Sequence, residues 1–490
     1  MKASTTAVGT AGARRHIVLV PGFAGFDALG QLEYYAGVTG AYQSWLKKVD
    51  SSGHGAVVLH YFDNLPTAGV ATRAERLRTY LAKRIARGEI QPNDKIALVG
   101  HSTGGLDIRR LLFSGKGDEH DPLLQVDGGQ EATSESTKSN PSDTRPATAV
   151  GISPAQILEA VDRVAFLSVP QLGTNIADWM RHQKLLRQAV LEQVRFSVEV
   201  ARMPHVDAVL HGVVGGLGRL AHTPDLVLAA QDALLEMAAK PGDPTVRADA
   251  REAGSELRLW LQHIVDDFAA IDDLAAEAPP GSKSPAHYTE ADRRSERASW
   301  KTHGITTMSI ATVAPRAFDF GSNQAKPLTL SDPRTWPHHD LVRGARTKMD
   351  VTYLCAYRAC AGGPFKYPPV GPSEADPRET DLLDTSLFAA DRVDLGDPDN
   401  GMPRIEVWDN DGIVNTASML WPDGPETILV AADHGDIIGH YVLRKRGACR
   451  PVSGRRYASY DLLKSGAGFA DDDFTKVWNK VFDFCVGPQP

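Results

Sequence analysis

The strongest indication of the fold of this chain lies in residues 95–113. An apolar run at 95–99 predicts a short buried strand, residues 108–113 predict a helix, and Gly100-His101-Ser102-Thr103-Gly104 joins the two. Small residues two positions before and after the serine permit a tight, strained turn that lifts the hydroxyl above the edge of a sheet. Ser102 is therefore a candidate nucleophile, and a chance Gly/Ser turn is the alternative.

The same alternation of strands and helices extends along the chain. Further strands are predicted at 17–20, 56–60, 164–168, 306–313, 405–408 and 427–431, and helices at 77–85 and 157–161. A strand followed by a helix and then by another strand favours parallel pairing, because the connection crosses over the sheet. The predicted fold class is α/β, with a mostly parallel central sheet.

Two stretches interrupt this pattern. Residues 115–150 are rich in Ser, Thr, Asp, Gly and Pro, which predicts a disordered surface insertion, and residues 176–300 show helical spacing, which predicts a large helical cap. The predicted division is a flexible N-terminus at 1–14, the first part of the α/β core at 15–114, the low-complexity insertion at 115–150, a core strand and helix at 151–175, the helical cap or lid at 176–300, and the second part of the core at 301–490.

A serine nucleophile needs a histidine base and a carboxylate that orients the base. In this strand–turn–helix context the two follow the serine in the order Asp, His. Asp411 lies in an Asp-Gly turn after the predicted strand at 405–408, and His434 follows the predicted strand at 427–431. Since the carboxyl ends of parallel strands meet at one edge of the sheet, both are expected beside Ser102. A turn or a histidine without chemistry is the alternative for each.

The sequence resembles the bacterial true lipases of the α/β-hydrolase fold at several separated places. The matching segments are Val20-Pro21-Gly22-Phe23-Ala24-Gly25-Phe26-Asp27 with residues 34–38, residues 100–105, residues 168–174, and the stretches 410–416 and 433–439, which resemble the thermoalkaliphilic lipases closely. The resemblance implies Ser102 as the nucleophile, His434 as the general base and Asp411 as its orienting carboxylate. It also implies an oxyanion hole formed by the backbone amides of Phe23 and Thr103.

Several positions leave alternatives open or depart from the lipase pattern. Asp409 and His440 are the rival acid and base, and we expect both to be local hydrogen-bonding or surface groups. Pro21 and Gln171 stand where many of these lipases have a histidine. Residues 64–91 contain no histidine, so we reject the zinc site that the thermoalkaliphilic enzymes carry there.

The resemblance also raises a question about a metal. Asp436, two residues after the candidate base, stands at the position of a calcium ligand in the lipase families. A hard cation takes several oxygen ligands, and the sequence identifies no others, so a structural calcium and a capping role for Asp436 both stay open. The expected chemistry itself requires no cofactor.

Within the predicted cap, Val209, Val213 and Leu217 place an apolar stripe at helical spacing on a glycine-rich segment. We take them as candidate substrate-binding residues of a cap over Ser102. The alternative is that the stripe is the core of a rigid helical subdomain.

The function predicted from these features is a serine carboxylic-ester hydrolase of the lipase or esterase kind, which acts through an acyl-enzyme intermediate. An acyltransferase or a polyester depolymerase would use the same triad, because they differ only in what reaches the acyl-enzyme. A non-catalytic binding scaffold of the same fold is a further alternative, since fold alone does not determine function.

Composition limits the partners of the chain. It carries 53 basic and 61 acidic side chains, for a net charge of -8, which disfavours a nucleic-acid partner. Its four cysteines form no CxxC pair, and no apolar segment is long enough to be a signal peptide or a membrane span. We expect a cytoplasmic protein, or a secreted one if a leader has been removed. The expected partner is a small-molecule or lipid ester, with transient contact to a lipid interface left open.

Overall fold

The computed structural model of this chain describes residues 13–23, 25, 28–29, 32–49, 56–113, 154–182, 263, 267–316, 351–362, 383–390, 392–393, 395, 405–420, 427–441, 463 and 465–487. The low-complexity insertion predicted at 115–150 and most of the flexible N-terminus predicted at 1–14 lie outside these residues. The central part of the predicted cap, at 183–262, lies outside them too, and with it Val209, Val213 and Leu217.

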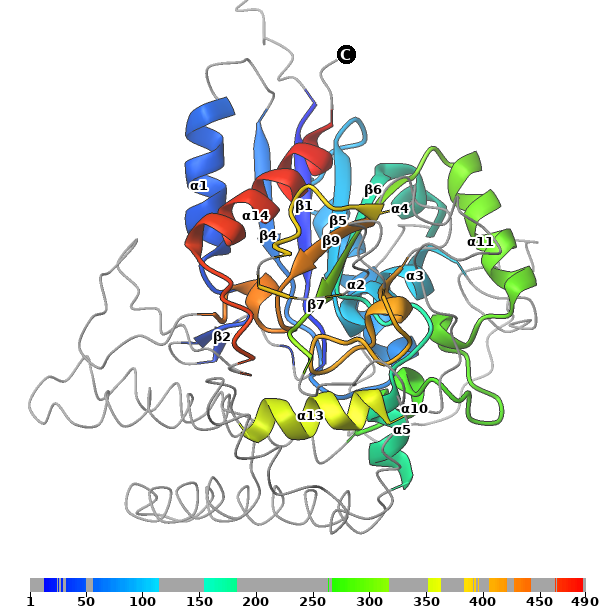
Figure 1. Cartoon of the computed structure of the whole chain (residues 1–490). Coiled ribbons are helices and arrows are strands. Elements are labelled where there is room, and N and C mark those ends of the chain that lie inside the picture. The colour runs from blue at the N-terminus through cyan, green and yellow to red at the C-terminus, as the bar shows by residue number, and fades with distance from the viewer. Residues whose placement is uncertain are drawn as a thin grey trace, which may run out of the picture.

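A seven-stranded sheet forms the centre of the fold (Figure 1). Its strands lie in the order β4, β1, β5, β6, β7, β9, β8, and each neighbouring pair is parallel. The strands are β1 Arg15–Val20, β4 Val57–Tyr61, β5 Lys95–His101, β6 Val161–Leu167, β7 Thr306–Val313, β8 Leu383–Asp384 and β9 Thr427–Ala431. A separate antiparallel pair joins β2 (Ala28–Leu29) to β3 (Leu32–Glu33). The parallel sheet confirms the predicted α/β class.

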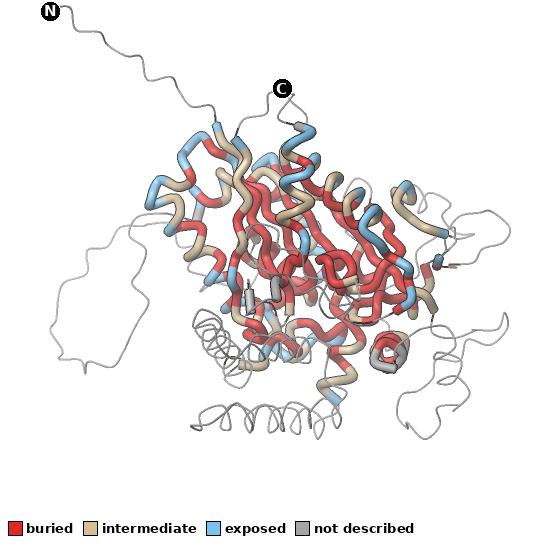
Figure 2. The backbone as a smooth tube through the Cα atoms, turned by 90° about the vertical axis from the view of Figure 1, so that its left-hand side faces the viewer, coloured by how far each residue is buried: buried red, intermediate tan, exposed pale blue. Residues whose placement is uncertain are grey.

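Helices cover both faces of the sheet. In β1, Ile17 and Leu19 belong to one hydrophobic core and Val18 and Val20 to another, because successive side chains of a strand point to opposite faces. The first core includes α1 (Val38–Val49) and α14 (Asp471–Val486), and the second includes α2 (Val70–Ala86), α3 (Thr103–Leu112) and α4 (Pro154–Ala160). Figure 2 shows the buried strands at the centre, with exposed residues on the outer helices.

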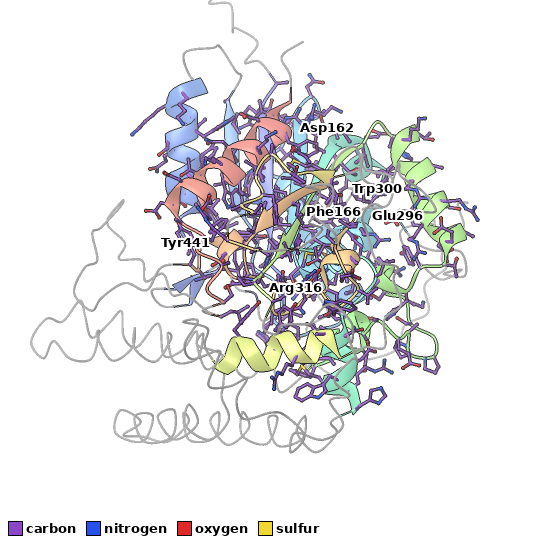
Figure 3. All side chains as sticks on the ribbon, viewed as in Figure 1. Asp162, Phe166, Glu296, Trp300, Arg316 and Tyr441 are labelled. Atoms are coloured by element: carbon purple, nitrogen blue, oxygen red, sulfur yellow. The ribbon has the colours of Figure 1, made fainter. Side chains whose placement is uncertain are left out.

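Helix α11 (Glu290–Thr302) contributes Trp300 to the second of these cores, although the sequence predicts that this range belongs to the cap. Its N-terminus is closed by a capping box, in which Thr289 and Asp292 each bond the other's backbone amide. Trp300 on this helix stacks on Phe166 of β6, with ring centroids 6.1 Å apart (Figure 3). The end of the range 176–300 therefore packs on the sheet as part of the core.

Shorter helices surround the carboxyl ends of the strands. They are α5 (Asn175–His182), which follows β6, α10 (Ala270–Leu274), α13 (Val351–Ala361) and 3-10 turns at Pro285–His287, Thr416–Met419 and Asp436–Ile438. Helix α5 packs against both α10 and α13. Among the described residues no helix is long and apolar enough to cross a membrane.

The strand predicted at 405–408 is wrong. Ile405 forms an isolated bridge, residues 407–408 form a turn, and Asn410 and Asn415 close a small antiparallel bridge. Side chains of Asn and Asp bond nearby backbone groups, which favours such turns over a strand. The segment instead docks on the end of β7, where the amide of Ala314 donates to the Asn410 carbonyl at 3.1 Å.

Candidate active site

The turn at Ser102 has the strained backbone that the sequence predicts. Ser102 adopts φ 54° and ψ -130°, between the last residue of β5 and the first residue of α3. A positive φ costs a serine free energy. The neighbouring glycines leave the space that this tight turn requires. A Cβ added to Gly100 would lie 2.7 Å from the Cα of Gly105, and one added to Gly22 would lie 2.6 Å from the Cβ of Ser102.

This turn decides the fold assignment. In this parallel sheet β5, third in the order β4, β1, β5, is followed directly by a strained serine and then by a helix, which is the strand–turn–helix geometry, or elbow, typical of α/β-hydrolases. The chain has the α/β-hydrolase fold. Ser102 lies at the carboxyl end of β5, where sheets of this class bind their ligands.

His434 and Asp411 contact each other directly. His434 comes three residues after β9, and its Nδ1 lies 2.7 Å from Oδ2 of Asp411. The other carboxylate oxygen of Asp411 accepts the amides of Ile413 at 3.0 Å and Val414 at 2.8 Å. Asp411 is buried and fixed by these bonds, so it can hold the imidazole of His434 in one orientation.

The rival acid has a different partner. Asp409 forms a bidentate ion pair with Arg316, with both nitrogen–oxygen distances at 2.8 Å, and also accepts the amide of Glu406. Figure 3 shows Arg316 beside α13. The rival base, His440, is buried, and its Nε2 lies 3.1 Å from the carbonyl oxygen of Tyr34. Asp409 and His440 thus serve local contacts, as expected from the sequence.

His101, the residue before Ser102, joins the elbow to the histidine loop. Its ring lies 4.6 Å from the ring of His434, between centroids, and its Nε2 lies 3.1 Å from the His434 carbonyl oxygen. Its Nδ1 lies 2.7 Å from the hydroxyl of Tyr34, which also accepts the amide of Gly22 at 2.8 Å.

The protonation of this chain of contacts follows from burial. Burial, with the nearby His434, holds the pKa of His101 well below its usual range, and burial raises the pKa of the Tyr34 phenol. The phenol of Tyr34 therefore stays protonated, and its hydroxyl donates a hydrogen bond to Nδ1 of His101. The neutral His101 then donates from Nε2 to the carbonyl of His434. Ser102, His434 and the loop at Gly22 are held against one another in this way.

Arg73 fixes the loop that contains Phe23. Its guanidinium, buried on α2, donates to the carbonyl of Pro21 at 2.7 Å and to that of Gly22 at 3.1 Å. The C=O of Gly22 and the N–H of Phe23 belong to one trans peptide and point in opposite directions. Arg73 therefore turns the Phe23 amide away from itself, while Gly22 packs against Ser102.

Asp107, on α3, completes this arrangement. It pairs with Arg73 at 2.9 Å and accepts the side-chain amide of Asn64 at 3.1 Å. Burial raises the pKa of Asp107 to about 6, and the contacts with Arg73 and Asn64 limit the rise because they favour the charged carboxylate. Thr103 is the first residue of α3, where backbone amides have no partner within the helix and the helix dipole favours negative charge.

Gln171, which departs from the lipase pattern, belongs to a buried ion-pair network. Arg109 of α3 donates to the side-chain oxygen of Gln171 at 3.0 Å and to Glu296 of α11 at 3.0 and 2.6 Å. Figure 3 shows Glu296 close to Trp300 on the same helix. Gln171 thus ties the end of β6 to the helix that carries the elbow.

Asp436 forms hydrogen bonds within its own loop, as expected for the capping role that the sequence left open beside calcium. Its Oδ2 accepts the amide of Asp433 at 2.8 Å, and Oδ1 of Asp433 accepts the amide of Gly435 at 3.0 Å. These bonds close the loop that carries His434. Within the described ranges no three His, Cys, Asp or Glu residues are grouped to hold a metal ion. Calcium at Asp436 stays a prediction.

Sequence reasoning missed Arg73, Arg316 and Thr312. The last lies in β7 and donates a hydrogen bond to Asp411. A polar residue within an apolar strand was the signal available for Thr312, because a buried hydroxyl needs a partner. For the two arginines the sequence offered no such signal, since their partners lie 34 and 93 positions away.

Comparison with known proteins adds weak similarities. No protein-family model matches the chain, and no curated protein matches its sequence. Among solved structures, it is similar to EstA from Clostridium botulinum, with 18% identity, coverage of 96% of this chain and 88% of that chain, and a TM-score of 0.38. A metagenomic carboxyl esterase, MGS0156, has 13% identity, coverage of 97% and 79%, and a TM-score of 0.31. Lipase 1 from Pelosinus fermentans has 15% identity, coverage of 87% and 93%, and a TM-score of 0.30.

Proposed function

We propose that this α/β-hydrolase chain is a serine carboxylic-ester hydrolase of the lipase or esterase kind. The single observation that carries the proposal is the 2.7 Å contact between Nδ1 of His434 and the buried carboxylate of Asp411, on a loop held against the strained turn of Ser102. A histidine in that state leaves Nε2 free to accept a proton from a serine hydroxyl.

Each residue of the site would have its own role in the reaction. Ser102 Oγ attacks the ester carbonyl carbon while Nε2 of His434 takes its proton, and Asp411 stabilises the imidazolium that forms. The negative oxygen of the tetrahedral intermediate accepts hydrogen bonds from the amides of Phe23 and Thr103. His434 then protonates the departing alcohol, which leaves an acyl group on Ser102. Water, deprotonated by His434, attacks this acyl-enzyme, and His434 then returns the proton to Ser102 Oγ as the acid leaves.

Two structural features favour the oxyanion role of these amides. The Phe23 amide belongs to the peptide whose carbonyl Arg73 holds, and Thr103 begins α3. Donors that the fold holds in this way would be preorganised for the developing negative charge. The chain-length preference would be set by the central part of the predicted cap, which, with Val209, Val213 and Leu217, lies outside the described residues.

Hydrolysis of a panel of p-nitrophenyl esters, from acetate to palmitate, tests the proposal. We expect Ser102→Ala and His434→Ala each to lower kcat by about 10⁵ or more on every ester that the wild type hydrolyses. Ser309→Ala, which alters a buried serine of β7 outside the site, serves as the folded control. Wild-type protein that hydrolyses no ester would favour the binding-scaffold alternative, and an active Ser102→Ala variant would reject the elbow serine as the nucleophile.

A further inference from the structure

The carboxylate of Asp411 has a partner besides His434. The hydroxyl of Thr312 donates to Oδ2 of Asp411 at 2.7 Å, the same oxygen that faces Nδ1 of His434. The hydroxyl of Ser168 lies 2.7 Å from the Thr312 hydroxyl. Ser168, Thr312 and Asp411 are each fully buried. A line of polar groups thus runs from the end of β6 through β7 to the histidine.

The direction of the hydrogen bonds along this line is fixed by chemistry. An ionised carboxylate only accepts, so the single hydroxyl proton of Thr312 goes to Asp411 and not to Sδ of Met419, a weaker acceptor 3.4 Å away. The Thr312 oxygen must then accept, and Ser168 must donate to it. Each oxygen of Asp411 accepts two bonds: Oδ2 from Thr312 and His434, and Oδ1 from the amides of Ile413 and Val414.

The positions of Ser168 and Thr312 support a role beyond packing. Ser168 follows β6 with φ 50°, a left-handed conformation that costs a serine free energy and is often retained at functional sites. Its amide donates to the carbonyl of Ile310 in β7, which holds its hydroxyl beside that strand. Thr312 lies next to last in β7, the strand on whose end the Asp411 segment docks.

We propose that Thr312 is a positioning residue for the acid of the triad and that Ser168 orients the Thr312 hydroxyl. The proposal rests on the proposed function. The Thr312 bond fixes Oδ2 so that it faces Nδ1 of His434. It also withdraws part of the negative charge of the carboxylate, which limits how strongly Asp411 stabilises the imidazolium form of His434.

Thr312→Val tests this role, because valine keeps the shape of threonine and lacks the hydroxyl. We expect kcat to fall about tenfold at unchanged KM, since a hydrogen bond to a charged group is lost. The acid limb of the profile of kcat/KM against pH should move to higher pH, because a carboxylate with one donor fewer favours the imidazolium more strongly. Thr312→Ser keeps the hydroxyl, so it should keep both kcat and the profile of kcat/KM against pH close to those of the wild type.

Ser309→Ala is the matched control. Ser309 lies on the same strand, is also buried, and donates to the carbonyl of Met419 at 3.0 Å instead of to Asp411. We expect it to leave the pH profile unchanged, whatever it does to the melting temperature. Equal shifts in Ser309→Ala and Thr312→Val would mean that any loss of a hydroxyl in β7 has this effect, and would overturn the proposal.

Ser168→Ala decides the matter if Thr312→Val does not fold. Without the Ser168 donor the Thr312 hydroxyl becomes a weaker donor, so the acid limb should move in the same direction by a smaller amount. Folded variants with the wild-type kcat and pH profile would overturn the positioning role. Failure of the proposed function looks different, because the wild type would then hydrolyse no ester or Ser102→Ala would stay active.

Discussion

Nδ1 of His434 lies 2.7 Å from Oδ2 of Asp411, whereas Asp409, two residues earlier, is held by Arg316. The sequence offered both aspartates as the acid of the triad. Their different partners predict different roles for the two aspartates.

Asp411→Asn should lower kcat by about 10⁴, because an amide can neither fix the tautomer of His434 nor stabilise its imidazolium form. Asp409→Asn should lower the melting temperature, since it removes a charge partner of Arg316, and should leave kcat close to that of the wild type. Initial rates and thermal unfolding of both variants check this. A larger loss of kcat in Asp409→Asn would show that Asp409 is the acid.

Gly22→Ala should lower kcat/KM by about 100-fold, because small displacements of reacting groups are costly. The new Cβ would lie 2.6 Å from the Cβ of Ser102 and 2.9 Å from the carbonyl oxygen of His101, so the loop or the elbow must shift. Gly40→Ala in α1 is the control, since no atom lies within 4 Å of the added Cβ and alanine favours a helix. Ester hydrolysis by the two variants gives the comparison, and wild-type activity in Gly22→Ala would mean that this close approach has no bearing on the reaction.

Glu296→Gln should reduce the free energy of unfolding by about 3–5 kcal/mol, because it removes the negative charge that pairs with the buried guanidinium of Arg109. Glu290→Gln, on the same helix, breaks a pair with Arg293 whose glutamate side chain is 56% exposed, and should change it by less than about 0.5 kcal/mol. Urea denaturation measures both. Similar values for the two variants would contradict the importance of the buried network.

A buried histidine pair predicts a loss of stability in acid. Nδ1 of His16 lies 2.8 Å from Nε2 of His60, and Nε2 of His16 lies 3.1 Å from Asp94. Burial lowers the pKa of both histidines, that of His60 to about 4, with Arg84 and His16 adding to the effect on His60. Between about pH 6.5 and pH 4 the unfolded chain binds a proton at His60 that the folded chain does not. The free energy of unfolding therefore decreases as the pH is lowered through that window.

His60→Gln should therefore show a smaller drop in melting temperature than the wild type between pH 7 and pH 4.5. His303→Gln, at an exposed histidine, should show the same drop as the wild type. Thermal unfolding across the pH range provides the test. Parallel curves for the wild type and His60→Gln would show that His60 does not contribute to the acid instability.

Much of the fold could be predicted because its signals are local. The strands predicted at 306–313 and 427–431 match β7 and β9, and β5 ends at the predicted turn, since short apolar runs between breakers determine buried strands. The strand predicted at 405–408 failed because the Asp and Asn residues that follow it favour turns. That segment reaches the sheet through hydrogen bonds to β7, which lies about 100 residues earlier and leaves no local pattern.

The candidate site divides in the same way. The motif that contains Ser102 indicates its strained turn directly. The contacts of Arg73 with Pro21 and Gly22, and of Thr312 with Asp411, join residues far apart in the sequence, and no spacing rule relates them. The choice between Asp409 and Asp411 likewise needed the position of Arg316, a long-range neighbour that folding alone brings to the site.

Covalent labelling shows which serine of this chain is the nucleophile. The wild-type protein is incubated with an alkyl fluorophosphonate, digested, and mapped by mass spectrometry. The proposed triad predicts one phosphonylated peptide, with the adduct on Ser102, much slower labelling in His434→Ala and no adduct in Ser102→Ala. An adduct on a different serine, or equal labelling of wild type and Ser102→Ala, would contradict the assignment of Ser102 as the nucleophile.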